Sequence, residues 1–185
     1  FLEFLWYDPT VEAKPLEELP VWRYFADLGL FSHRTSWDKE SVAFACKCAP
    51  GGGWKQWRIG HGDEKSKGVL ALGHHHPDAG SFLLIRGRDY LAVDEGYSGD
   101  KKTKHHNVVL VDGQGYCGDG GYDAHRRLGK DQTPEVLAME TCEKGFYFCA
   151  DTAKLYAPEL RMRQVRREIF STHKGWILIA DTISS

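Results

Sequence analysis

Short apolar runs separated by turn-forming residues are the feature of this sequence that most constrains its fold. Residues 81–85, 90–93 and 108–111 are rich in Val, Ile, Leu, Phe or Tyr and are bounded by Gly, Asp or Lys. Similar runs recur along the chain, at residues 34–37, 41–48, 136–140, 145–149, 153–156 and 176–180. Short strands at regular intervals predict an all-β fold, an antiparallel β-sandwich.

The central part of the chain predicts the position of a candidate functional site. Four residues, 86–89, join the first two central runs, which favours an antiparallel hairpin. Residues 108–111 could form a third strand that pairs antiparallel with the second. In that case one edge of the sheet would contain the start of the first strand, the end of the second and the start of the third. The residues at those places are His74, His75, His76, Asp94, Glu95, His105 and His106. Two imidazole clusters and a carboxylate have the composition of a zinc site, although any one of these histidines alone is better explained as a solvated loop residue.

Other segments are less regular. Residues 160–170 contain several arginines and fit a strand with a charged outer face, with a helix as the alternative; 176–180 would be the hairpin partner. Residues 54–66 and 114–129 are expected to be long loops. The glycines at 51–53 lack the Lys-Ser/Thr and the following helix that a phosphate-binding loop requires.

Composition sets the class of protein. The 185 residues suit one soluble domain, and a formal net charge of −2 gives no argument for nucleic acid or an anionic membrane as partner. No apolar run approaches the ~20 residues that cross a bilayer. The five cysteines form no CxxC pair, which argues against a cysteine-based zinc knuckle. The first residues show no signal peptide and no initiator Met, so we expect the numbering to begin inside a longer chain or after processing.

Three linked motifs stand out: His74-x-His76-Pro77-Asp78-Ala79-Gly80-Ser81-Phe82, Leu91-Ala92-x-Asp94-x-Gly96-Tyr97 and His106-Asn107-x-Val109-Leu110-Val111-Asp112-Gly113. Together they resemble the heparinase II/III family of polysaccharide lyases. Their order and spacing match together, and weaker similarity extends over most of residues 21–181.

The resemblance implies a fold and an activity. Members of the family combine an N-terminal α/α toroid with β-sandwich domains, so residues 1–20 would be the tail of a helical domain and a linker. Residues 21–185 would be the β-sandwich domain, truncated at its C-terminus. The implied activity is cleavage of uronic-acid-containing glycans by β-elimination, in the periplasm or outside the cell. The partners would be an anionic polysaccharide and the missing toroid, which would supply the other catalytic groups, so the isolated chain is expected to be inactive.

The resemblance also implies roles for individual residues. His76, Asp94 and His106 match positions that hold zinc in some members, and His74 matches a histidine that reaches into the catalytic cleft. We expect the zinc to be structural, with a catalytic Lewis acid as the minority view. A slip of one residue would exchange His76 and His106 for His75 and His105; the residues that follow favour the former pair.

Neighbouring residues would complete the site. Asp78 and Asn107 are expected to orient the imidazoles by hydrogen bonds, with ordinary turn chemistry as the alternative. Lys104, Arg126 and Tyr116 are candidates for binding the substrate.

Two other functions remain open on the sequence. The first is a non-catalytic carbohydrate-binding sandwich with a structural metal, stacking sugars on Trp54, Trp57, Tyr116 and Tyr122. The second is a metal-dependent hydrolase or cupin-like oxygenase in which the same cluster keeps an open coordination position. The sequence does not identify the glycan.

Overall fold

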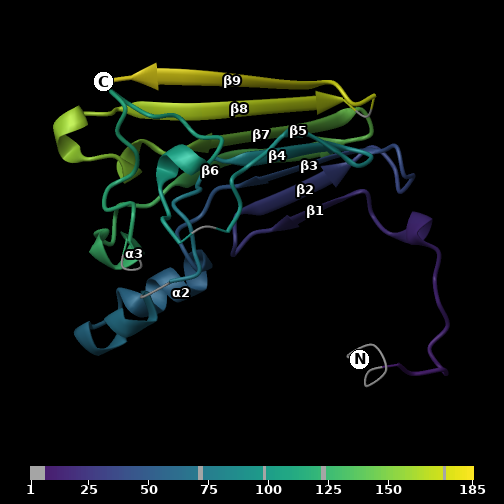
Figure 1. Ribbon diagram of the computed structural model, residues 1–185, viewed down its shortest axis with the longest axis horizontal. Coiled ribbons are helices and arrows are strands. Elements are labelled where there is room, and N and C mark those ends of the chain that lie inside the picture. Colours follow the sequence, from purple (N-terminus) through teal and green to yellow (C-terminus); the bar gives the residue numbers. More distant parts are fainter. Residues whose placement is uncertain (1–6, 71–72, 98, 122–123, 173) are drawn as a thin grey trace.

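Two antiparallel sheets make up the framework of the chain. The structure, a computed structural model, describes residues 7–70, 73–97, 99–121, 124–172 and 174–185 (Figure 1). The first sheet has the strand order β1-β2-β3-β4-β5 and the second β6-β7-β8-β9, with every neighbouring pair antiparallel. Each strand therefore pairs with its neighbour in sequence. The predicted all-β, antiparallel sandwich is confirmed.

The first sheet contains the predicted central hairpin. Its strands are β1 (Trp22–Phe25), β2 (Leu30–Arg34), β3 (Val42–Lys47), β4 (Phe82–Arg86) and β5 (Asp89–Ala92). The hairpin of β4 and β5 turns at Gly87, whose φ of +57° glycine adopts more readily than residues with a Cβ atom. Both strands are displaced by one residue from the predicted ranges.

The second sheet is built from longer strands, β6 (Glu135–Cys142), β7 (Gly145–Asp151), β8 (Gln164–Thr172) and β9 (Ile177–Ser184). The arginine-rich segment is therefore a strand and not a helix, and its hairpin partner is the predicted one. Val165, Ile169 and Ser171 alternate with more exposed residues along β8, so that one face of the strand is buried.

Helical segments are short and lie outside the sheets. They are η1 (Leu16–Glu18), α2 (Gly53–Gly60), η2 (Glu64–Leu70), η3 (Thr103–His105), α3 (Ala124–Arg127), η4 (Ala153–Leu155) and η5 (Pro158–Leu160). Figure 1 shows α2 and α3 close together, away from the face-to-face strands. Within the described ranges, no helix is both long and apolar enough to cross a membrane.

The main core lies between the two sheets. Phe31 and Phe44 of the first sheet pack against Phe146, Phe148 and Ile169 of the second, and all five are buried. The rings of Phe31 and Phe146 meet edge to face with centroids 4.7 Å apart, an arrangement that aromatic pairs favour. This contact fixes the two sheets as layers of one sandwich.

A second core supports the connecting segments. Trp57, Tyr116, Leu128, Leu155 and Tyr156 form its buried centre. Trp57 on α2 is 2% exposed and its indole nitrogen donates to the carbonyl of Lys130 at 3.1 Å. The predicted loop at 54–66 is thus wrong: an amphipathic helix followed by a 3-10 segment buries its apolar side here.

Three predicted strands do not form. Of residues 34–37, only Arg34 belongs to a strand, at the end of β2. Residues 108–111 make only one isolated bridge, between Val111 and Gln114, and residues 153–155 are a 3-10 turn. Val109 and Val111 pack instead against the second core, and the hydroxyl of Tyr156 donates to the carbonyl of Val109 at 2.6 Å. The apolar run is therefore buried without a sheet partner.

Candidate functional site

The predicted site residues lie in the connections between strands, not in the strands themselves. His74, His75 and His76 belong to the connection from η2 to β4, Asp94 follows β5, and His106 follows η3. The third strand that was expected to bring His106 to the rim is absent. The connection that follows β5 nevertheless contacts the end of η3, because the amide of Glu95 donates to the carbonyl of His105 at 3.1 Å.

Asp94 and His106 form the centre of the site. A carboxylate oxygen of Asp94 lies 2.7 Å from Nδ1 of His106, so this nitrogen carries the hydrogen that the carboxylate accepts. The same oxygen accepts from the hydroxyl of Ser81 at 3.2 Å, and the other accepts from the amide of Gly96 at 2.9 Å. Asp94 is thereby held by bonds from three segments, and it fixes the tautomer and the orientation of the His106 ring.

Asn107 holds the backbone around this pair. Its side-chain amide donates to the carbonyls of Phe82 at 2.9 Å and Val93 at 3.0 Å, at the start of β4 and just beyond β5. Its backbone amide donates to the hydroxyl of Ser81 at 3.1 Å. Asn107 therefore positions the strand ends, and the imidazole is oriented by Asp94.

His76 lies beside His106. The two ring centroids are 5.2 Å apart and the rings are nearly perpendicular. Burial lowers the pKa of His76 below its ordinary value, and the neighbouring His106 lowers it further. Nε2 of His106 is buried and has no hydrogen-bond partner among the described residues.

His74 lies at the exposed edge of the site. The hydroxyl of Tyr97 is 2.8 Å from its Nδ1, and the two rings are nearly parallel with centroids 5.8 Å apart. The ammonium of the buried Lys101 lies 5.1 Å from the centroid of the Tyr97 ring, within cation–π range. Tyr97 thus links an exposed imidazole to the buried part of the site.

The alternative pair of histidines is turned toward other partners. Nδ1 of His75 accepts from the amide of Gly52 at 3.2 Å, and Nδ1 of His105 lies 3.0 Å from a carboxylate oxygen of Glu95. His76 and His106, not His75 and His105, are therefore the two rings that the fold places together.

The remaining predicted residues have different surroundings. Asp78 is paired with the ammonium of Lys47 at 2.7 Å. Tyr116 is 5% exposed and its hydroxyl donates to the carbonyl of Ala79 at 2.5 Å, so its ring supports the histidine segment from inside and offers no face to a sugar. Lys104 and Arg126 are exposed. Tyr122 lies outside the described residues.

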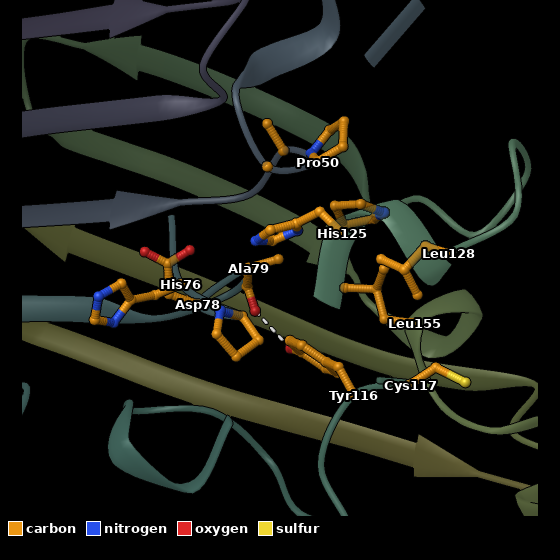
Figure 2. Close-up of a pocket in the computed structure, with 13 residues that line it drawn as sticks. Pro50, His76, Asp78, Ala79, Tyr116, Cys117, His125, Leu128 and Leu155 are labelled. Carbon is orange, nitrogen blue, oxygen red and sulfur yellow. Dashed lines mark hydrogen bonds between the residues drawn. The ribbon is translucent and has the colours of Figure 1, made fainter. Parts of the chain in front are cut away.

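A small cavity of about 20 Å³ lies behind the histidine segment (Figure 2). His125 and Leu128 approach it from one side, and His76 and Asp78 from the other. His125 is 7% exposed, and burial lowers the pKa of His125 to about 4. A Cβ atom at Gly51 would come within 2.5 Å of its Nδ1, so the ring packs where only glycine fits.

The side chains of His76, Asp94 and His106 are of the types that bind zinc, but they are not arranged around a common point. Two imidazoles and a carboxylate are zinc ligands, and the unpartnered Nε2 of His106 is a nitrogen available to a metal. In the part of the chain that the structure describes, however, no group of three or more His, Cys, Asp or Glu side chains is arranged to hold a metal ion. None of the five cysteines, all of which lie within the described residues, forms a disulfide.

Sequence reasoning missed Ser81, Tyr97 and His125. Ser81 and Tyr97 lie within the motifs quoted above, but a hydroxyl in a turn carries no signal of its role. His125 stands alone in a Gly- and Tyr-rich segment, and only the packing of Gly51 shows that it is buried.

Comparison with known proteins adds an independent result. Residues 66–185 match the family described as heparinase II/III-like, C-terminal. The fold is similar to that of heparan sulfate lyase HepC from Pedobacter heparinus, with 18% identity, a TM-score of 0.58, and coverage of 88% of this chain and 22% of that one. It is also similar to the heparinase III-BT4657 gene product, with 18% identity, a TM-score of 0.61, and coverage of 95% and 23%. The chain thus spans less than a quarter of the length of these proteins.

Proposed function

Because the chain belongs to the heparinase II/III-like family, we propose that it is the β-sandwich portion of a polysaccharide lyase that cleaves uronic-acid-containing glycans by β-elimination. The observation that carries the proposal is the position of His74, an exposed imidazole bonded to Tyr97 at the rim of the Asp94–His106 pair. A catalytic group needs access to substrate and a fixed orientation, and His74 has both.

The chemistry explains why an imidazole is useful here. In β-elimination a base removes the proton at C5 of the uronate, the bond from C4 to the glycosidic oxygen breaks, and that oxygen leaves with the electron pair and takes up a proton. Negative charge then grows on the uronate carboxylate, where a cationic or hydrogen-bonding group stabilises it. Since Nδ1 of His74 is bonded to Tyr97, its Nε2 is the nitrogen left for the substrate.

We further propose that His76, Asp94 and His106 hold a structural zinc ion. The proposal is supported by the donor types, the closeness of the two rings and the buried, unpartnered Nε2 of His106. A carboxylate bonded to Nδ1 and a metal bound by Nε2 lie on different sides of the His106 ring, so the proposal requires Asp94 to leave Nδ1 and the His76 ring to move closer. A metal bound there would tie together three connections that are otherwise held by hydrogen bonds alone.

A carbohydrate-binding module without catalysis is less well supported. Two of the four aromatic residues that it would use, Trp57 and Tyr116, are 2% and 5% exposed, so neither presents a ring face to solvent. Sugar stacking requires such a face.

The test is product formation by the complete protein on a panel of uronate polymers. Wild-type protein should release products that absorb through the new C4–C5 double bond, and His74→Ala should lower kcat by at least about 100-fold. His105→Ala is the matched control, because this ring pairs with Glu95 and should leave turnover near wild type. Binding of a polymer without cleavage by the wild type, or full turnover by His74→Ala, would contradict the proposal.

A further inference from the structure

Arg167 reaches from the second sheet into the connections that carry the site. It lies on β8 opposite Asp181 of β9, and its side chain is 13% exposed. Nε and Nη2 each donate to one carboxylate oxygen of Asp181, both at 2.8 Å. A planar guanidinium held in this bidentate way has a fixed direction.

The remaining nitrogen of the same guanidinium holds two backbone carbonyls. Nη1 donates to the carbonyl of Gly80 at 2.8 Å and also to the carbonyl of Asn107. Gly80 has a φ of +82° and ends the turn that leads from the histidine segment into β4. Asn107 directly follows His106. One side chain therefore holds the two backbone segments that flank the site.

Hydrogen bonds continue from these two carbonyls to the imidazole. The residue after Gly80 is Ser81, whose hydroxyl accepts from the amide of Asn107 at 3.1 Å and donates to Asp94 at 3.2 Å. Asp94 in turn accepts from Nδ1 of His106 at 2.7 Å. The path from Asp181 to His106 thus contains no gap that a water molecule would have to bridge.

We propose that Arg167, oriented by Asp181, is a positioning residue that sets the geometry of the Asp94–His106 pair from the second sheet. Lysine cannot replace it, because one ammonium cannot bond Asp181 through two parallel N–H groups and also reach both carbonyls. The inference concerns the geometry of the pair, and only its kinetic test rests on the proposed function.

Arg167→Lys tests the inference, and Arg166→Lys is its matched control. Arg166 is the next residue on β8 but points to the other face, where its guanidinium lies 3.4 Å from Glu168. In the complete protein with ¹⁵N-labelled histidine, Arg167→Lys should shift or broaden the imidazole signals of His106. It should also speed hydrogen exchange of the Asn107 amide by at least tenfold, while the Cys117 amide, bonded to Leu155, stays unchanged. Arg166→Lys should change none of these.

Kinetics add a readout that a purely structural ion pair would not move. If the protein is a lyase, Arg167→Lys should lower kcat at least tenfold with KM changed less than about twofold, since the effect is on orientation. Should Arg167→Lys fail to fold, Asp181→Asn, which keeps the shape of the partner, should change the same signals in the same direction. A lower melting temperature with unchanged His106 signals and unchanged Asn107 exchange would overturn the inference, and would do so whether or not the protein has lyase activity.

Discussion

The hydroxyl of Tyr97 lies 2.8 Å from Nδ1 of His74, and the two rings are nearly parallel. Removing this hydroxyl should leave the His74 ring free to rotate. We expect Tyr97→Phe to lower kcat of the complete protein on its glycan by about tenfold, through loss of orientation. Steady-state kinetics on the substrate found in the uronate panel measure this. Tyr90→Phe is the control, because Tyr90 is 63% exposed on β5; equal losses in both variants would contradict the role of Tyr97.

The two candidate pairs of histidines predict different metal contents. Elemental analysis of the purified protein should find zinc in the wild type, and His76→Ala and His106→Ala should each lose most of it, because a ligand is removed. His75→Ala and His105→Ala should keep it, since these rings face Gly52 and Glu95. Removing zinc with a chelator should also lower the melting temperature of the wild type. Loss of zinc in the second pair of variants but not in the first would reverse the assignment.

The isolated chain should have little or no lyase activity. The resemblance assigns the remaining catalytic groups to a toroid, and this chain spans only 22% to 23% of the compared lyases. We expect no measurable unsaturated product from residues 1–185 at a substrate concentration that saturates the complete protein, with both proteins assayed at the same concentration. Robust release of product by the 185-residue chain would show that the sandwich carries a complete catalytic site.

The stability of the sandwich should depend on the charge of His125. The pKa of this buried ring is about 4 in the folded state, against an ordinary value of 6.5, mainly because of burial and then because of Lys47; Asp78 opposes the shift, and His75 also faces the ring. An unfolded chain therefore binds a proton at pH values where the folded chain does not, so stability falls as the pH drops from about 6.5 to 4. The loss is on the order of 3 kcal/mol.

Denaturant unfolding at several pH values checks this dependence. His125→Gln should flatten the slope between pH 6.5 and 4, since glutamine does not titrate, even if the variant is less stable at every pH. His61→Gln, which changes a half-buried imidazole bonded to backbone carbonyls near α2, is the control. An unchanged slope in His125→Gln would mean that another group controls the acid response.

The strands that were predicted correctly are those whose burial follows a simple alternation. On β8, Val165, Ile169 and Ser171 face the core while Arg166 and Phe170 lie on the other face, and this alternation is visible in the sequence. The hairpin of β4 and β5 was equally predictable, because its turn is short and contains Gly87.

The errors arose where apolar residues are buried by distant parts of the chain. Val109 and Val111 read as a strand, but they pack on the second core, and the hydroxyl of Tyr156 bonds the carbonyl of Val109. Trp57 read as an exposed loop residue, but a helix turns it toward Lys130. The contacts with Tyr156 and Lys130 cannot be predicted from the pattern of apolar residues in each segment.

The contact between Asp94 and His106 was predicted, but its predicted cause was wrong. His106 and Asp94 meet as expected, yet the third strand that was supposed to bring them together is absent, and Ser81, Asn107 and Arg167 hold them instead. The choice between His75 and His76 depends on where Gly52 and His106 lie, which the order of residues along one segment does not reveal.

Each sheet is assembled from strands that are consecutive in the chain, and His74, His76, Asp94, Tyr97 and His106 all lie in the links between strands. None of these five residues belongs to a paired strand register. A substitution at one of them can therefore alter the chemistry of the site while the strand pairing stays the same, whereas Asn107 and Arg167 bond to backbone at the strand ends and connect the scaffold to the site.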